Sequence, residues 1–385
     1  VYKRQVDTPV LLAIPLFTLA GYVLGESKAS TRLVRMTDAL LGWMPGGLAV
    51  VSLFACAFFT ALTGASGATI IALGAILYPA MKQAGYDERF NLGLITSSGS
   101  LGLLFPPSIA LILYGVIAQQ MSLDQPVTID DLFKAGQLPG FHMLLLLIAW
   151  SMYKSTAEKI PTSAFEASEL FRALRESVWE MTLPFMLIGG IYSGYFAVSE
   201  AAAVAVMYVL IVEVVILREV PLSQLPRIMR DSMVLVGGVL IILSVSLAST
   251  NYMIDAEIPT QLFEFIREHI DSKLTFLILL NIFLLVLGMM LDVFSALVII
   301  VPLTLPIAIG YGIHPVHFGI IFLANMQIGY FTPPVGMNLF IASYRFNKPI
   351  TTLYRATIPF MLILLLAVII ITYWPALTMT LIENS

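Results

Sequence analysis

The chain has 385 residues, of which 59% are hydrophobic and only 11% are charged, and its mean hydropathy is +0.92. A soluble domain of this size would need far more surface charge, so the composition indicates a polytopic membrane protein. The net charge of −4 gives no sign of a nucleic-acid partner, and the single cysteine excludes a disulfide framework or a cysteine metal cluster within this sequence.

The N-terminal part is predicted to hold one hydrophobic segment and one amphipathic helix. Residues 10–24 form the hydrophobic segment, which is short for a full membrane span. Residues 26–44 mix charged and apolar side chains, a pattern typical of a helix that lies along the membrane interface. The sequence starts with Val1 rather than Met, so we expect it to lack some N-terminal sequence.

Two apolar stretches, 46–81 and 91–120, carry no formal charge, and each contains a helix breaker near its middle. The breaker is the small-residue cluster 63–67 in the first stretch and the glycine- and proline-rich segment 99–107 in the second. The first stretch is too long for one helix and fits a helical hairpin or a re-entrant pair. Membrane proteins tolerate such breaks only where the freed backbone is buried in protein or lines a cavity.

Residues 121–272 are predicted to alternate spans with polar connectors. Within 121–140 we expect a polar loop that contains a short helix at 129–134. Ser199 is expected to be the N-cap of a later span, with Glu200 on the positive end of its dipole. The expected spans are 141–153, 181–196, 201–217 and 232–253, and an amphipathic helix is expected at 255–272.

The C-terminal part contains a second broken apolar region. Asp292 is the only formal charge between Lys273 and Arg345. An ionisable residue in such a sequence is costly and indicates a functional site, although a helix cap at the membrane edge is the alternative. The expected elements are an apolar helix at 274–291, a proline-containing segment at 293–309, a broken segment at 318–344 and a last span at 358–381.

No motif for catalysis or for a cofactor appears in the sequence. It has no nucleophile with a matching base and no phosphate-binding loop, and the absence of a Walker sequence argues against direct coupling to ATP. His314 and His317 have a proline between them and no third ligand nearby, which favours a loop over a metal site.

Five pairs of glycines and prolines recur at one constant spacing, as Pro79 and Pro306 show (306 − 79 = 227). The spacing predicts two structural repeats, about 54–118 and 288–346. Paired broken segments in two repeats are typical of secondary transporters that bind their solute at the repeat interface. The alternative is that glycine and proline are simply common in membrane helices. The other pairs are Gly85 with Gly312, Gly102 with Gly329, Pro106 with Pro333 and Pro107 with Pro334.

The order and spacing of these motifs resemble the large membrane subunit of the tripartite ATP-independent periplasmic (TRAP) transporters. The resemblance covers nearly the whole chain. It is carried by the segments 12–17, 45–49, 63–67, 77–79, 85–86, 98–109, 113–115, 199–203 and 329–336.

The resemblance implies an all-α polytopic membrane fold of the elevator type, like that of the ion transporter superfamily. It has two repeats, for which inversion is the commoner arrangement, with helical hairpins and broken helices. The implied organisation is an N-terminal span and arm helix (1–45), a first transport-domain repeat (46–120), scaffold spans and arm helices (121–272), a second transport-domain repeat (273–346) and a C-terminal span (347–385).

The resemblance also implies a function and partners. It indicates sodium-coupled uptake of an organic acid, such as a C4-dicarboxylate or a sialic acid, delivered by a periplasmic binding protein. A small membrane subunit would be the second partner, in the bacterial inner membrane, with sodium as coupling ion and no other cofactor. The alternatives are a stand-alone sodium-coupled anion transporter and a membrane-embedded enzyme, for which Asp292 lacks a visible second catalytic group.

Candidate site residues fall in the two broken regions. Unwound backbone and half-helix ends supply carbonyl ligands for a cation, and half-helix N-termini with hydroxyls suit a carboxylate. The sodium positions implied by the resemblance are Thr60, Thr63, Gly102, Phe105 and Pro107 for one site, and Gly288, Leu291, Gly329, Thr332 and Val335 for the other. The substrate candidates are Ser66, Ser100, Asp292, Asn325 and Asn338; apart from Asp292, each could instead be a locally bonded polar group.

Overall fold

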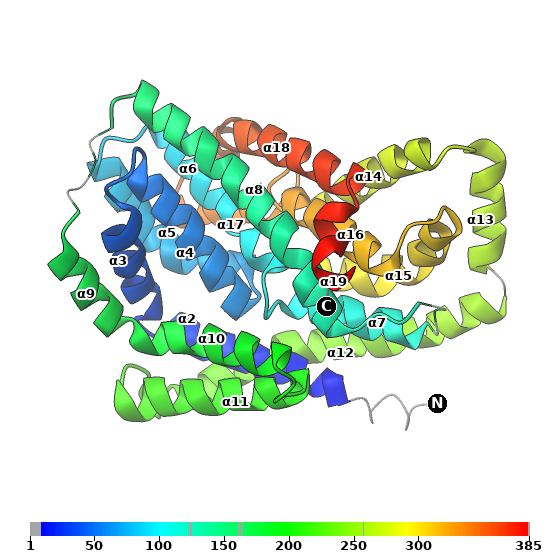
Figure 1. Cartoon of the computed structure of the whole chain (residues 1–385), viewed down its shortest axis with the longest axis horizontal. Coiled ribbons are helices and arrows are strands. Elements are labelled where there is room, and N and C mark those ends of the chain that lie inside the picture. Colours follow the sequence, from blue (N-terminus) through cyan, green and yellow to red (C-terminus); the bar gives the residue numbers. More distant parts are fainter. Residues whose placement is uncertain are drawn as a thin grey trace.

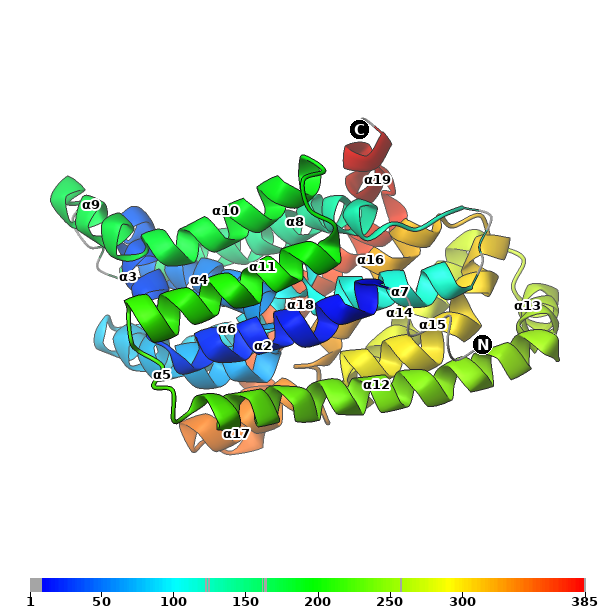
Figure 2. The same ribbon diagram turned by 90° about the horizontal axis from the view of Figure 1, so that it is seen from below.

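A computed structural model describes residues 9–121, 123, 125–160, 162, 165–256 and 258–383, which form helices joined by short connections (Figure 1). No strand occurs in these residues, which confirms the all-α prediction. Helices satisfy every interior backbone group within one segment, as an apolar bilayer requires. Figure 2 shows the longest helix, α12 (Leu225–Asp255), extending along one side of the molecule.

The helices of the N-terminal third include the first hairpin and the first break. The two hairpin helices are α4 (Gly47–Thr63) and α5 (Ser66–Gln83), joined by two residues. The break lies between α6 (Glu88–Ser98) and α7 (Ile109–Gln120) and contains the short 3₁₀ helix η2 (Leu101–Leu104). Before the hairpin come η1 (Pro9–Leu12), α2 (Ala13–Glu26) and α3 (Ala29–Leu41).

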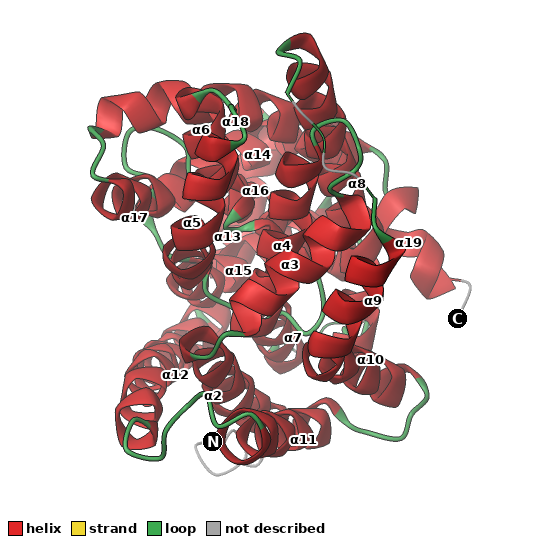
Figure 3. Cartoon of the chain, turned by 90° about the vertical axis from the view of Figure 1, so that its left-hand side faces the viewer, coloured by secondary structure: helices red, strands yellow, loops and turns green. Residues whose placement is uncertain are grey.

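The middle third supplies covering helices. Helix α2 packs against α11 and α12, and Figure 3 shows these three together along one edge. Helix α8 packs against α4 and α18, and α9 packs against α3. The bounds are α8 (Ile129–Ala157), α9 (Ala167–Glu176), α10 (Val178–Tyr192), α11 (Val198–Leu210) and the π-helix η3 (Ile211–Ile216).

The C-terminal third holds the second hairpin and the second break. The hairpin helices α14 (Lys273–Met290) and α15 (Val293–Gly310) are joined by Leu291 and Asp292. The second break separates α16 (Pro315–Gly329) from α17 (Met337–Phe346). The remaining helices are α13 (Ile258–His269), α18 (Ile350–Tyr373) and α19 (Ala376–Glu383).

The bounds of the two hairpins differ by the spacing seen in the sequence. Helix α5 starts at Ser66 and α15 starts at Val293, a difference of 227, and their last residues, Gln83 and Gly310, differ by the same number. The amphipathic helices before the hairpins, α3 and α13, also begin within two residues of this spacing.

Several helices of the described chain are suited to a membrane. Six are long and apolar enough to cross it, and the bent pair Glu88–Leu104 and Ile109–Gln120 could be a seventh, with an angle of 42° between its parts. This confirms a polytopic membrane protein. The six are Ile129–Ala157, Val198–Ile216, Leu225–Val245, Lys273–Met290, Val293–Gly310 and Ile350–Tyr373.

Three local predictions were wrong. Residues 121–140 are not mainly loop, because α8 starts after the N-cap Thr128 and continues through Pro139. Ser199 is not an N-cap: Ala197 takes that position, and the Glu200 carboxylate accepts from its N–H at 2.9 Å. The loop predicted for His314 and His317 is wrong for His317, which lies inside α16; His314 is the N-cap of that helix and accepts from the Val316 N–H, with proline at the first helical position.

The glycines of α8 explain the first of these differences. A Cβ on Gly136 would overlap the Leu104 carbonyl oxygen, and one on Gly140 would lie 2.9 Å from the Phe105 ring. These small residues are therefore sites where α8 approaches the first break closely. They resemble loop residues in the sequence because the same residue type serves turns and tight helix packing.

Candidate functional site

The C-terminal end of α4 contacts the first break without intervening side chains. A Cβ on Gly102 would overlap the backbone nitrogen of Ala61 and the carbonyl oxygen of Ala57, so only glycine permits this approach. The hydroxyl of Thr60 donates to the carbonyl of Gly99 at 2.8 Å and lies 2.6 Å from the Thr69 hydroxyl. The structure thus brings the predicted positions Thr60 and Gly102 together.

Oxygen atoms are concentrated at this contact. Helix α4 ends at Thr63, and Gly64 terminates it with a φ of +67°, in the left-handed region that favours glycine. The last carbonyls of a helix lack intrahelical partners and carry partial negative charge, which favours a cation. Phe105 adopts an extended conformation directly after η2, followed by Pro106 and Pro107. Proline removes a backbone donor there and leaves carbonyl oxygens.

The second hairpin meets the second break in the same manner. A Cβ on Gly329 would lie 2.5 Å from the Cα of Gly288. Within the break, the Thr332 hydroxyl donates to the Ile328 carbonyl at 2.8 Å, so its lone pairs remain available as acceptors. Leu291 is the C-cap of α14 in an extended conformation, and Val335 is half exposed. The predicted pair Gly288 and Gly329 is therefore in contact.

The two hairpin tips differ in how their second helices begin. At α15, Asp292 Oδ1 accepts from the N–H groups of Phe294 and Ser295, both at 3.0 Å. The N–H of Val293 donates to the hydroxyl of the buried Tyr330 at 2.6 Å. At α5, no side chain of the described residues caps the helix. The first N–H groups of α5 therefore have no side-chain cap, whereas those of α15 are paired with Asp292 and Tyr330.

Asp292 thus has the role of helix cap, and its function beyond the cap is testable. We expect Asp292→Asn to keep thermal stability, because asparagine is an equally good N-cap, but to lower the rate of the solute uptake that the resemblance implies. Asp292→Ala should also lose stability, by about 1 kcal/mol. Thermal unfolding and transport assays on both variants separate the effects. Uptake at the wild-type rate in the asparagine variant would reduce Asp292 to a cap.

Three of the five substrate candidates connect the two broken regions. The Ser66 hydroxyl, at the start of α5, donates to Asn338 Oδ1 at 2.9 Å, at the start of α17. The Asn338 amide reaches the Thr96 carbonyl at 3.4 Å. The Ser100 hydroxyl donates to the Gln327 carbonyl at 2.9 Å. Ser66, Ser100 and Asn338 are all buried. Their hydrogen bonds connect the first hairpin and the first break to the second broken region, and we call these three residues the polar seam.

Asn325 lies elsewhere. Its amide donates to Asn281 Oδ1 at 2.7 Å, on the side of α16 that faces α14. The structure therefore does not bring Asn325 to the polar seam formed by Ser66, Ser100 and Asn338. Sequence reasoning also missed Tyr330, which fixes the start of α15. Its position beside Gly329 in the second break was the available signal.

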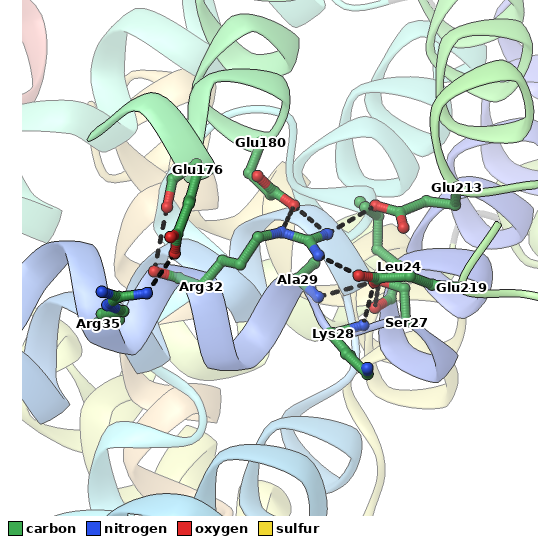
Figure 4. Close-up of polar contacts among 11 residues, drawn as sticks. Leu24, Ser27, Lys28, Ala29, Arg32, Arg35, Glu176, Glu180, Glu213 and Glu219 are labelled. Atoms are coloured by element: carbon green, nitrogen blue, oxygen red, sulfur yellow. Dashed lines mark hydrogen bonds and ion pairs between the residues drawn. The ribbon is translucent and has the colours of Figure 1, made fainter. Parts of the chain in front are cut away.

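A buried charge cluster fastens the arm helix α3 to α10, η3 and the segment after it (Figure 4). The Arg32 guanidinium is paired with Glu180 and Glu219 and lies 3.5 Å from Glu213. Burial alone would lower the pKa of Arg32, but hydrogen bonds to Glu180 and Glu219 raise it above its usual value. Sequence reasoning missed this cluster, whose members come from three distant segments.

The described residues do not form a site for a tightly bound metal ion. They contain no grouping of three or more histidine, cysteine, aspartate or glutamate side chains that could hold a metal ion. The oxygens at the helix ends are main-chain carbonyls and hydroxyls, a donor set that suits a hard monovalent cation such as sodium.

Comparisons with known proteins point to one family. The family model described as "Tripartite ATP-independent periplasmic transporter, DctM component" matches residues 2–377. A C4-dicarboxylate TRAP transporter large permease protein DctM of Pseudomonas aeruginosa is 34% identical over 372 residues, which cover 96% of this chain and 86% of that protein. An isethionate TRAP transporter permease protein DctMQ of Oleidesulfovibrio alaskensis is 34% identical over 377 residues, which cover 97% of this chain and 58% of that protein.

A solved structure has a similar fold. The Alcanivorax borkumensis YdaH transporter matches 97% of this chain and 86% of its own, with a TM-score of 0.68. The sequence identity is 17%, so this likeness concerns the fold alone. It agrees with an all-helical transporter architecture.

Proposed function

The chain belongs to the family of the DctM component of tripartite ATP-independent periplasmic transporters, and we propose that it couples the uptake of an organic acid to sodium entry. As a large permease subunit it is a multi-pass protein of the bacterial inner membrane and not an enzyme. We propose that its partners are a small membrane subunit and a periplasmic substrate-binding protein.

Two close contacts made through glycines, one at the end of each hairpin, support the proposal of sodium coupling. Gly102 against α4 and Gly329 against Gly288 each leave a helix C-terminus beside an unwound segment. Each contact presents main-chain oxygens and no formal positive charge, which favours binding of a small cation. We assign one sodium ion to each contact, with the two sets of five positions named in the sequence analysis as candidate ligands.

The substrate acid is assigned to the seam formed by Ser66, Ser100 and Asn338. The uncapped N-terminus of α5 offers backbone N–H groups and the positive end of a helix dipole to a carboxylate. Binding of the carboxylate would replace the hydrogen bond between Ser66 and Asn338. Asp292, at the turn of the second hairpin, would orient the polar groups that face the substrate. Asn325 would hold α16 against α14 through its hydrogen bond to Asn281.

An elevator mechanism with two inverted repeats is part of the proposal. The repeated spacing of 227 residues between the hairpin bounds supports two related halves. In this mechanism the hairpins and breaks would move together past the covering helices, carrying the solute across the membrane. Helix α3, held to α10 by Arg32, would then be part of the stationary frame.

Sodium binding is testable on the purified protein. We expect sodium chloride to raise the unfolding temperature relative to potassium chloride at equal ionic strength, since a ligand that binds only the folded state stabilises it. At a sodium concentration a hundred times its dissociation constant the stabilisation is about 2.7 kcal/mol. Equal unfolding temperatures in the two salts, at all concentrations, would argue against both sodium sites.

The side chain of Thr332 offers a test of the second site. If its hydroxyl is a ligand, Thr332→Val should raise the sodium concentration for half-maximal uptake by roughly tenfold, equivalent to one lost interaction of about 1.4 kcal/mol. Thr357→Val is the matched control, because the buried Thr357 hydroxyl makes the same type of bond, to the Leu353 carbonyl at 3.0 Å. An unchanged sodium requirement in Thr332→Val would remove the hydroxyl from the site.

A further inference from the structure

Three exposed arginines lie where one membrane helix ends and the next begins. The helix formed by α11 and η3 and the helix α12 are both long and apolar enough to cross a membrane, so the connection between them lies at a membrane surface. Figure 2 shows this connection at the same end of the molecule as α3 and α9. Arg218 is in the connection, and Arg227 and Arg230 are near the start of α12.

The two ends of α12 differ in charge. Its start, within residues 217–231, has the three arginines and two carboxylates, whereas residues 255–273 at its other end are mainly acidic. Basic residues close to the ends of a span are drawn to the negatively charged side of a membrane. The charged residues of 255–273 are Asp255, Glu257, Glu264, Arg267, Glu268, Asp271 and Lys273.

Hydrogen bonds add a fourth cation to the arginines. The backbone N–H of Lys28 donates to Glu219 Oε2 at 2.8 Å, and the other oxygen of Glu219 pairs with Arg32 (Figure 4). Arg227 pairs with Glu26 at 2.7 Å. The turn between α2 and α3 therefore meets both the segment after η3 and the start of α12. The basic patch at this meeting point consists of Lys28, Arg218, Arg227 and Arg230.

The carboxylates beside the basic patch do not neutralise it. Its four cations have two exposed carboxylate partners, Glu26 and Asp231, which leaves two positive charges (4 − 2 = 2). Neither Lys28 nor Arg218 forms an ion pair with any part of the chain that the structure describes. The patch is therefore a positive surface with donors available to an anion.

Apolar side chains are exposed among these cations. Leu222 is 73% exposed, Val215 is 62% exposed and Met229 is 50% exposed. Such side chains are unfavourable in water but suit the acyl region of a bilayer. The mixture of cations and exposed apolar groups at the ends of two spans distinguishes the patch from a charged loop in water.

We propose that the basic patch binds the phosphate groups of anionic phospholipids, with Val215, Leu222 and Met229 against their acyl chains. Arginine pairs with two phosphate oxygens at once, and long basic side chains reach from a helix end to the headgroups. A zwitterionic headgroup carries an additional positive charge, which the patch would repel. The patch is distinct from the solute site, because none of its members belongs to the sodium assignments or to the polar seam.

The test compares two phospholipids with the same acyl chains. Dioleoyl phosphatidylglycerol is anionic and dioleoyl phosphatidylcholine is zwitterionic, and each is titrated into the purified permease in neutral detergent while the unfolding temperature is recorded. We expect phosphatidylglycerol to bind about ten- to thirtyfold more tightly, as two uncompensated charges predict. Potassium chloride at high concentration should remove most of this preference by screening.

Combining Arg218→Gln with Arg230→Gln should weaken phosphatidylglycerol binding by about fivefold for each cation removed. Phosphatidylcholine binding and the unfolding temperature without lipid should stay near the wild-type values, because both side chains are exposed. Replacing the same two arginines with lysine keeps the charge and should keep most of the preference.

The matched control combines Arg267→Gln with Lys273→Gln, which removes two exposed cations at the other end of α12 and should leave the preference unchanged. The proposal is overturned if the wild type binds both lipids equally, if the preference persists in the variant of Arg218 and Arg230, or if the control loses as much. Protection of the patch by the small membrane subunit, without any preference for phosphatidylglycerol, would also overturn it and assign the patch to that partner.

Discussion

Replacing Gly102 with alanine is expected to abolish or strongly reduce sodium-dependent uptake. The new Cβ would overlap the backbone of Ala57 and Ala61, which belong to a helix and cannot move aside as a flexible side chain could. The break would have to shift away from α4 at a cost of about 1 to 3 kcal/mol. If the sodium-loaded state bears this cost, sodium affinity falls by roughly ten- to hundredfold.

Gly238→Ala is the matched control for this prediction. Gly238 lies inside α12, and a Cβ there would meet no atom within 4 Å. Alanine in a helix interior is favoured over glycine, so this variant should be as stable as the wild type or more stable by about 0.4 to 1 kcal/mol. Uptake is measured against sodium concentration for both. Normal sodium dependence in Gly102→Ala would mean that the contact between α4 and η2 is not a cation site.

The second large effect is expected at Arg32. Arg32→Ala would leave Glu180 and Glu213 without their cation, and both side chains are only 1% exposed. Breaking a buried ion pair from one side typically costs about 3 to 5 kcal/mol, because the remaining charge stays buried and unpaired. We expect a large fall in the unfolding temperature of the purified protein. Adding Glu180→Gln to Arg32→Ala should recover part of it, since one uncompensated carboxylate is then removed.

Arg35 lies one turn further along the same helix and makes a useful comparison. It pairs with Glu169 at 2.7 Å and also with Glu176, but its side chain is 41% exposed. Exposed ion pairs contribute little to stability, so Arg35→Ala should unfold close to the wild-type temperature. A loss in Arg32→Ala as small as the one expected for Arg35→Ala would show that the Arg32 cluster is no more than a set of surface pairs.

The hairpins and breaks could be predicted because their signals are local. A charge-free stretch interrupted at 63–67 is too long for one helix, and the structure places the hairpin turn at Gly64 and Ala65. The second hairpin turns at Leu291 and Asp292, and Asp292 is the only formal charge between Lys273 and Arg345. The family resemblance was confirmed by the family model over nearly the whole chain.

Contacts between distant segments could not be predicted in the same way. Ser66 and Asn338 are 272 residues apart, and Arg32 is 148 residues from Glu180, so no local pattern pairs them. Residues 135–140 of α8 were predicted to be loop, whereas Gly136 and Gly140 lie inside the helix and let α8 approach the first break. Both kinds of error arise where tertiary packing decides the role of a residue.

We propose that a sodium gradient and a binding protein together drive uptake by this permease. The most direct measurement is uptake of a radiolabelled organic acid into proteoliposomes that contain both membrane subunits, with and without an inward sodium gradient and with and without the cognate binding protein. We expect uptake only when both are present. Full uptake without the sodium gradient would contradict sodium coupling, and full uptake without the binding protein would favour a stand-alone transporter.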